Sequence, residues 1–283
     1  MRNLSTLAWR VYDAPTKPWH GVVADTEGDD SVHVMRVERR DGVSQLTLAH
    51  ITPTGTEELA VLEVASAPPH VPDVADFRLL ADGGSSVNHM PAICVIGSGG
   101  DIVLMPVDEE ASAPAEVVGS VDQGILAAAW SPEEDVLVLI TGGEKRLIVM
   151  TREFEVMSET MLSTEAFGDD QPVNVGWGSK STQFHGSEGK QAAMAAANAP
   201  EESDPRGPLV PEDDGLPRIS WRGDGAFFVT SSAEASHDTV HRILRTYTRT
   251  GTLSATSDRS VRGISHVLAC RPTGNLIATT QRM

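Results

Sequence analysis

The sequence predicts an all-β chain, a WD40-like β-propeller that is incomplete at its C-terminus. Three observations predict this fold. Short runs rich in Val, Ile, Leu and Thr are cut by Gly, Asp and Pro, glycine-containing turns join these runs in pairs, and a unit of anchor, turn and strand recurs every 44–49 residues. Almost no stretch of the chain keeps the 3.6-residue apolar period that is typical of a helix.

The apolar runs have the length of β-strands. Residues 31–55, 91–110 and 146–159 contain several of them. Tight turns are expected at three glycine-containing pieces, which are DG (41–42), GSGGD (97–101) and TGGEK (141–145). Because glycine readily adopts the positive φ that such turns require, these pieces predict antiparallel hairpins.

The recurring unit is clearest in AAAWSPEEDVLVLITG (127–142), RISWRGDGAFFVTSS (218–232) and VLACRPTGNLIATTQ (267–281). Each segment has an anchor residue, then a polar turn, then an apolar strand. The anchors are Trp130, Trp221 and Cys270. The second strand is expected at the same offset in all three, beginning at Val136, Phe227 and Leu276. A period of this length with four short strands indicates a propeller blade.

Trp177 fills a gap in this series, because it follows Trp130 by 47 residues and precedes Trp221 by 44. We interpret Trp177 as the anchor of a further blade whose second strand is degenerate. The chain stops at TTQRM (279–283), directly after the second strand of a repeat. Since propellers usually close by pairing strands from both termini, we expect a truncated propeller or an unusual closure.

We expect a single partial propeller domain over residues 1–283, with a flexible acidic and Ala/Pro-rich insertion at about 190–215. The segment KQAAMAAANAPEESDPRGPLVPEDDG combines a short Ala-rich stretch with prolines and acidic residues. Such a composition offers little apolar surface to bury and is typical of a flexible excursion.

Composition favours a cytoplasmic or nuclear protein. The first residues lack the apolar region of a secretory signal, and no apolar run approaches the roughly 18–20 residues that span a bilayer. Cys94 and Cys270 are the two cysteines, and both lie in apolar surroundings. They are interpreted as buried thiols in a reducing compartment, rather than as a disulfide or a nucleophile.

The net charge of −18 argues against a general nucleic-acid binder, because phosphates would be repelled. The charge is uneven, however: residues 216–283 hold 9 basic and 4 acidic residues, whereas residues 1–215 hold 13 and 36. The basic excess gathers at Arg242, Arg245, Arg249, Arg259 and Arg262. These arginines form either a solvated strand face or a docking surface for an acidic partner or RNA.

The stretch VNVGWGSKSTQFHGSEGKQAA (173–193) concentrates polar and aromatic residues between glycines. A phosphate-binding loop is excluded by spacing, because only two residues separate Gly186 from Gly189 and no Ser or Thr follows Lys190. A hydrolase elbow is excluded because His185 stands where the motif around Ser187 needs glycine.

A binding role for this loop remains. Exposed aromatic and charged side chains at this density suit a contact surface for a partner. The candidate contact residues are Lys180, Gln183, Phe184, His185, Glu188 and Lys190.

Metal, cofactor and catalytic sites are not indicated. The histidines are scattered singly, and His237 and His241 lie in an alternating segment where a spacing of four does not bring ligands together. No pair of carboxylates stands out as an acid and base. We therefore expect neither catalytic residues, nor a metal, nor a cofactor.

The loop VNVGWGSKSTQFHGSEGKQAA, the segment RISWRGDGAFFVTSS, the start MRNLSTLAWR and the pattern SHVLACRPTGNLIATTQ together resemble the Elongator complex protein 1 family. The resemblance spans the whole chain and corresponds to the family's N-terminal propeller. It implies a longer subunit with two propellers, a helical solenoid and a C-terminal dimerisation region. This chain ends within the first propeller, so the dimerisation region and the C-terminal basic RNA-binding region are absent from it.

The resemblance also implies a function. The family scaffolds a complex that modifies the wobble uridine (U34) of tRNA, and catalysis resides in a separate radical-SAM and acetyltransferase-like subunit. The implied partners are that subunit and a second WD-repeat subunit, with tRNA bound mainly through the complex and no membrane involved. The alternatives are a WD-repeat adaptor of another pathway and a propeller enzyme with a site at the central channel.

Overall fold

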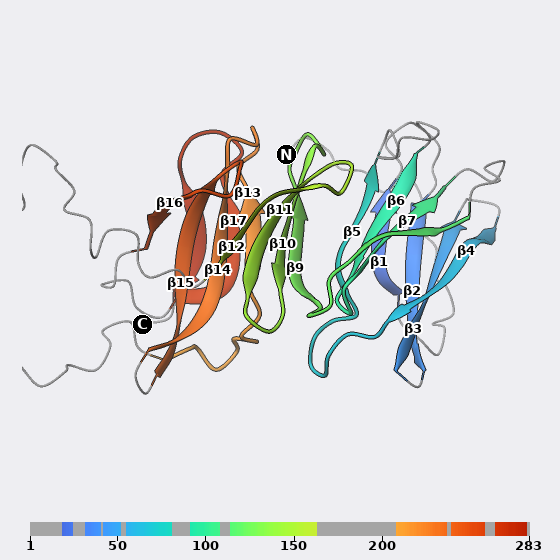
Figure 1. Ribbon diagram of the computed structural model, residues 1–283, viewed down its shortest axis with the longest axis horizontal. Coiled ribbons are helices and arrows are strands. Elements are labelled where there is room, and N and C mark those ends of the chain that lie inside the picture. Colours follow the sequence, from blue (N-terminus) through green and yellow to red (C-terminus); the bar gives the residue numbers. More distant parts are fainter. Residues whose placement is uncertain are drawn as a thin grey trace, which may run out of the picture. The chain divides into compact units, whose positions relative to one another are not determined.

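The computed structural model of the chain is built of β-strands (Figure 1). It describes residues 19–24, 32–40, 42–51, 55–80, 91–107, 114–162, 208–236, 239–257 and 264–281. All regular elements within these ranges are strands, which confirms the prediction of an all-β chain. In this part of the chain, no helix has the length and apolar character that crossing a membrane requires.

The chain divides into two compact units, and the first comprises residues 1–124. It contains two four-stranded antiparallel sheets whose strands follow one another in chain order. The first sheet is formed by β1 (Trp19–Ala24), β2 (Val32–Arg40), β3 (Val43–Ile51) and β4 (Thr56–Ala65). The second is formed by β5 (Val74–Leu80), β6 (Ala92–Gly97), β7 (Asp101–Pro106) and β8 (Glu116–Ser120).

The core of the first unit lies between its two sheets. Met35 and Leu48 of the first sheet pack in one cluster with Ile93 and Met105 of the second, and all four are fully buried. Removing this apolar surface from water stabilises the pairing of the two sheets.

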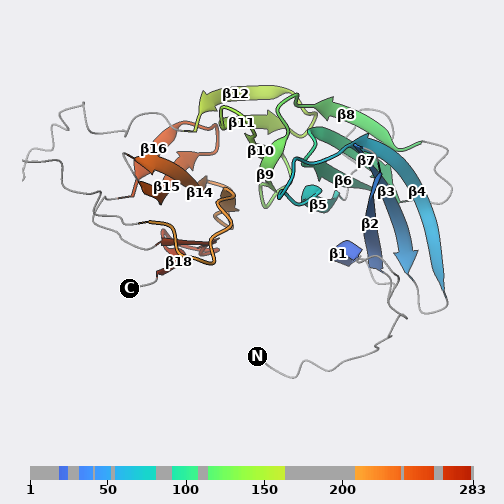
Figure 2. The same cartoon turned by 90° about the horizontal axis from the view of Figure 1, so that it is seen from below.

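The second unit, residues 125–283, repeats the pattern. Figure 2 shows the strands of its first sheet in order from β9 to β12. This sheet contains β9 (Ile125–Trp130), β10 (Val136–Thr141), β11 (Arg146–Thr151) and β12 (Val156–Met161). The next contains β13 (Arg218–Trp221), β14 (Phe227–Ser236), β15 (Thr239–Thr248) and β16 (Leu253–Thr256), and a strand pair contains β17 (Ile264–Cys270) and β18 (Ile277–Gln281).

The predicted hairpins are present. Their closing residue pairs are Arg40 with Val43, Ile96 with Ile102, and Ile140 with Leu147. The glycines of these turns meet the expected need for positive φ, as at Gly42 with φ of 87° and Gly143 with φ of 55°.

The turn between β6 and β7 needs its glycines for a second reason, which is close packing. A Cβ atom at Gly99 would collide with the carbonyl oxygen of Ala65, and one at Gly100 would collide with the carbonyl oxygen of Val121. Asp101 completes the turn by accepting a hydrogen bond from the main-chain N–H of Ala65 at 2.8 Å. This glycine turn therefore packs against the end of β4 and against the residue that follows β8.

The predicted repeat is borne out in all three copies. Strands β10 and β14 begin at Val136 and Phe227 as expected, and β18 begins one residue after Leu276. The same main-chain hydrogen bond closes each turn. It runs from Ser131 N to Val136 O at 2.8 Å, from Arg222 N to Phe227 O at 3.0 Å, and from Arg271 N to Leu276 O at 2.9 Å.

Trp177, which we interpret as the anchor of a further blade, lies outside the described residues. Val138 of β10 and Val149 of β11 share one buried cluster with Phe228 of β14. The sheet β9–β12 thus packs directly on the sheet β13–β16.

Candidate functional site

The predicted partner-contact loop lies outside the described residues. This holds for each of its candidate residues, Lys180, Gln183, Phe184, His185, Glu188 and Lys190. The structure does describe the two ends of the segment that contains them. Before it, Leu162 is buried and its N–H donates to Lys145 O at 2.9 Å. After it, residues 208–217, which we call the strap, return the chain to β13.

The predicted basic patch has a different character from the one expected. Arg242 and Arg245 on β15 are only 2% and 3% exposed, so they belong neither to a solvated face nor to a docking surface. Arg249 is partly exposed and engaged with a neighbouring turn, whereas Arg259 and Arg262 lie outside the described residues. The two buried arginines point inward because each meets a carboxylate of the same unit.

Arg245 pairs with Glu234 of β14 through both guanidinium Nη atoms, with Nη2 at 2.9 Å from Oε2. The hydroxyl of Ser232 donates to the same carboxylate at 2.9 Å. Burial would raise the pKa of Glu234, but the hydrogen bonds and charge of Arg245 outweigh burial and lower the pKa. Both partners lie on the β14–β15 hairpin, so this pair acts within one sheet.

Arg249 follows β15 and joins two sheets. Its Nη2 donates to Asp135, and its Nη1 donates to the carbonyl oxygen of Gly225 at 3.0 Å. Asp135 also accepts a hydrogen bond from Ser131 Oγ at 2.6 Å. Burial would raise the pKa of Asp135, but these donors outweigh burial and lower the pKa. Arg249 therefore connects the turn after β9 with the turn after β13.

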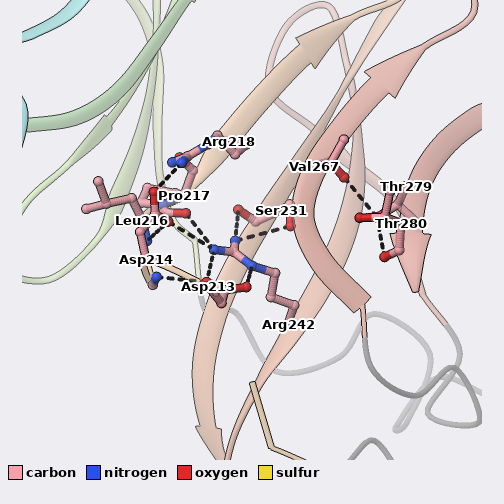
Figure 3. Close-up of polar contacts among 11 residues, drawn as sticks. Asp213, Asp214, Leu216, Pro217, Arg218, Ser231, Arg242, Val267, Thr279 and Thr280 are labelled. Carbon is pink, nitrogen blue, oxygen red and sulfur yellow. Dashed lines mark hydrogen bonds and ion pairs between the residues drawn. The ribbon is translucent and has the colours of Figure 1, made fainter. Parts of the chain in front are cut away.

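Arg242 holds the strap (Figure 3). Its Nε and Nη2 donate to the two carboxylate oxygens of Asp213 at 2.5 and 2.6 Å, and both side chains are fully buried. Nη2 also donates to Leu216 O at 2.9 Å, and Nη1 donates to Ser231 O at 3.3 Å. A bidentate pair of this kind fixes the orientation of the guanidinium relative to the carboxylate as well as the distance between them.

The second acidic residue of the strap, Asp214, pairs with Arg218 of β13 and lies 3.6 Å from Arg242 Nη2. Asp213, Asp214 and His266 of β17 bring three possible metal-ligand atoms within 4.8 Å of one another. Both carboxylates are already neutralised by guanidinium groups, which a cation would have to displace. We therefore interpret this cluster as an ion-pair network rather than a metal centre.

Two side chains that could act as nucleophiles, Cys270 and Ser131, are engaged in structural contacts. The pKa of the Cys270 thiol is raised by burial, and its Sγ contacts Ser220 O at 3.3 Å. Ser131 Oγ donates to Asp135 and accepts from the main-chain N–H of Val136 at 3.1 Å. These contacts give both side chains a structural role.

A family model described as the ELP1 first N-terminal beta-propeller matches residues 1–283, the whole chain. The chain belongs to this family. This match agrees with the antiparallel four-stranded sheets described above, and with the resemblance stated from the sequence.

Several curated relatives of this chain are named Elongator complex protein 1. Elongator complex protein 1 of Mus musculus is 40% identical over 190 residues, which are 67% of this chain and 13% of that protein. Elongator complex protein 1 of Drosophila melanogaster is 40% identical over 194 residues, which are 68% of this chain and 14% of that protein. In Schizosaccharomyces pombe the identity is 37% over 190 residues, with 66% and 15% covered. The chain thus spans about one seventh of the length of the relatives that it matches.

Among solved structures, Chaetomium thermophilum Sqt1 is similar with a TM-score of 0.45 and 14% identity, over 88% of this chain and 51% of that one. A likeness of this size carries no information about function.

Sequence reasoning missed two features of the ELP1 propeller chain. Asp213 was not distinguished from the other acids of its segment, because nothing local marks it as the partner of Arg242. The turns TREFE and TRTGT, which begin at Thr151 and Thr248, also escaped notice. In both turns, the main-chain oxygen of the first threonine accepts a hydrogen bond from the main-chain N–H three residues later. The donors are Phe154 N, at 3.1 Å from Thr151 O, and Gly251 N, at 2.9 Å from Thr248 O. Their shared Thr-Arg start was a detectable signal.

Proposed function

We propose that this chain is part of a non-catalytic scaffold subunit of the Elongator complex. In this role it supports modification of the wobble uridine of tRNA by organising the catalytic subunit and its partners. The observation that carries the proposal is the match of residues 1–283 to the ELP1 first propeller. The names of the curated relatives support membership of a multi-subunit complex.

The internal contacts support a scaffold rather than an enzyme. The arginines that looked like a free basic surface instead connect sheets, as Arg249 does with Asp135, or fix a segment, as Arg242 does with Asp213. A rigid body of this kind can present loops at defined positions. We propose that the loop residues Phe184, His185 and Lys190, with their neighbours, contact a partner subunit. The proposed partners are the radical-SAM and acetyltransferase-like subunit and the second WD-repeat subunit.

Cytoplasmic or nuclear action is part of the proposal. It is supported by the low cysteine content of the chain, whose two cysteines, Cys94 and Cys270, lie in apolar surroundings, as suits a reducing compartment. Contact with tRNA is proposed to occur mainly through the complex, because the net charge of −18 disfavours general binding to nucleic acid.

Purification of the full-length subunit from its own cells tests this function. We expect the co-purifying proteins to include the radical-SAM and acetyltransferase-like subunit in an amount comparable to the bait. Recovery of an unrelated set of proteins, without that subunit, would instead identify an adaptor of another pathway.

A second experiment separates scaffold from enzyme. The purified subunit alone, incubated with tRNA and the substrates of the complex, is expected to leave the wobble uridine unmodified, whereas the assembled complex modifies it. Modification by the subunit alone would overturn the non-catalytic assignment.

A further inference from the structure

The strap is held on the sheet mainly by hydrogen bonds from Arg242. The strap contains no regular element, and several of its residues, including Pro208, Pro211 and Glu212, are exposed. Besides those of Arg242, its contacts include a hydrogen bond from Leu209 N to Val240 O at 2.9 Å, the pairing of Asp214 with Arg218, and a hydrogen bond from Arg218 Nη1 to Pro217 O at 3.0 Å. Segments with few buried apolar contacts open easily unless polar contacts hold them.

The guanidinium of Arg242 reaches the strap at two separate places. It donates to the side chain of Asp213 and to the main-chain oxygen of Leu216, while Nη1 remains on Ser231 of β14. Asp213 in turn accepts a hydrogen bond from Gly215 N at 2.8 Å, which shapes the strap between these two contacts. One side chain thus fixes both the position and the local conformation of the strap.

Arg245 provides the natural comparison. It lies three residues further along the same strand, is equally buried, and also forms a two-contact pair with a carboxylate. Its partner, Glu234, belongs to the same hairpin, so the pair makes no contact with the strap. Burying an ion pair is often no more stabilising than burying apolar side chains, but it can specify one arrangement. At Arg242 the arrangement specified is that of the strap.

We propose that Arg242 is a positioning residue that fixes the strap on the β14–β15 hairpin, and thereby sets where the chain returns from residues 163–207. It acts on the partner contact through that return point, so this part of the inference rests on the proposed function. Releasing the strap leaves the blade folded but frees the point at which the chain returns to β13.

The test compares Arg242→Met with Arg245→Met in the full-length subunit. Hydrogen exchange is measured on peptides that cover residues 208–217, together with the thermal midpoint and recovery of the catalytic subunit. Both variants lose a buried ion pair, so both midpoints should fall by a similar amount. Only Arg242→Met should speed exchange in the strap, by about tenfold or more, and reduce recovery of the partner. Equal exchange in the strap for the two variants would overturn the proposal.

Asp213→Asn is the second variant, because it keeps the size of the side chain and removes only its charge and one acceptor. It should also speed exchange in the strap, and it decides the matter if Arg242→Met does not fold. The outcomes separate this inference from the proposed function. If the strap is released but partner recovery persists, while a Phe184, His185 and Lys190 triple alanine variant loses the partner, the loop contact stands and positioning by Arg242 is wrong. If the triple variant also keeps the partner, the loop contact itself fails.

Discussion

Trp221 Nε1 donates a hydrogen bond to the main-chain oxygen of Ala129 at 3.2 Å. Ala129 immediately precedes Trp130, the anchor of the adjacent sheet. The next anchor repeats the relationship, because Cys270 Sγ contacts the main-chain oxygen of Ser220, which precedes Trp221, at 3.3 Å. Each of these two anchors therefore links its sheet to the residue before the neighbouring anchor, which explains why the anchors recur at the same place in the repeat.

Replacing Trp221 by Phe should therefore weaken the joint between two sheets. The change keeps an aromatic ring but leaves Ala129 O without its donor, and we expect a loss of about 1–2 kcal/mol in the free energy of unfolding. Trp130→Phe is the matched control, because no hydrogen bond of its Nε1 is found within the described residues. Chemical denaturation of both variants checks this, and an equal loss in the two would contradict it.

The fourth position after each anchor is the left-handed position of the turn. It is occupied by Glu134, Gly225 and Gly274, with φ of 60°, 65° and 88°. Gly225→Ala should cost about 1–2 kcal/mol, since it adds left-handed strain and a Cβ against Arg249 Nη1. Glu134→Gly relieves strain at the same position and should leave stability unchanged or slightly raised. Denaturation midpoints that fall equally in both variants would contradict the equivalence of the turns.

Glu234 should make the free energy of unfolding depend on pH in the acidic range. Arg245 lowers its pKa in the folded chain below the ordinary value of 4.5. Its contribution is therefore present above about pH 4.5 and is lost as the pH falls through the lowered folded value. Glu234→Gln should be less stable than wild type at pH 7, and the gap should narrow toward pH 3. A stability difference between Glu234→Gln and wild type that does not change with pH would be the contrary result.

Asp76 should behave in the opposite way. Burial raises its pKa from 3.8 to about 6, although the main-chain N–H of Phe77 and the charge of Arg78 partly oppose this. The folded chain then binds a proton that the unfolded chain releases between these two values, so stability falls as the pH rises through that range. Asp76→Asn should be more stable than wild type at pH 7 by up to roughly 3 kcal/mol, and equal to it at pH 3. Denaturation at both pH values measures this difference.

The sequence predicted the parts of this fold that depend on local pattern. Residues 136–141 are entirely apolar or Thr and form the fully buried strand β10, and the glycines of the turns stand where positive φ or close packing requires them. It could not predict which distant carboxylate meets which arginine. Arg242 and Asp213 are 29 residues apart, and only the folded sheet brings them together. For the same reason, the sequence could not show that Arg242 and Arg245 of the predicted basic patch form buried ion pairs.

The most direct test of the scaffold proposal is recovery of the catalytic subunit with the full-length protein carrying Phe184→Ala, His185→Ala and Lys190→Ala. Glu57→Ala, Glu63→Ala and Glu116→Ala, on exposed residues of β4 and β8, provide the control triple. We expect the first triple variant to keep the thermal midpoint of wild type and to lose most of the catalytic subunit, while the control retains it. Full recovery of the catalytic subunit with the first variant would contradict the scaffold proposal.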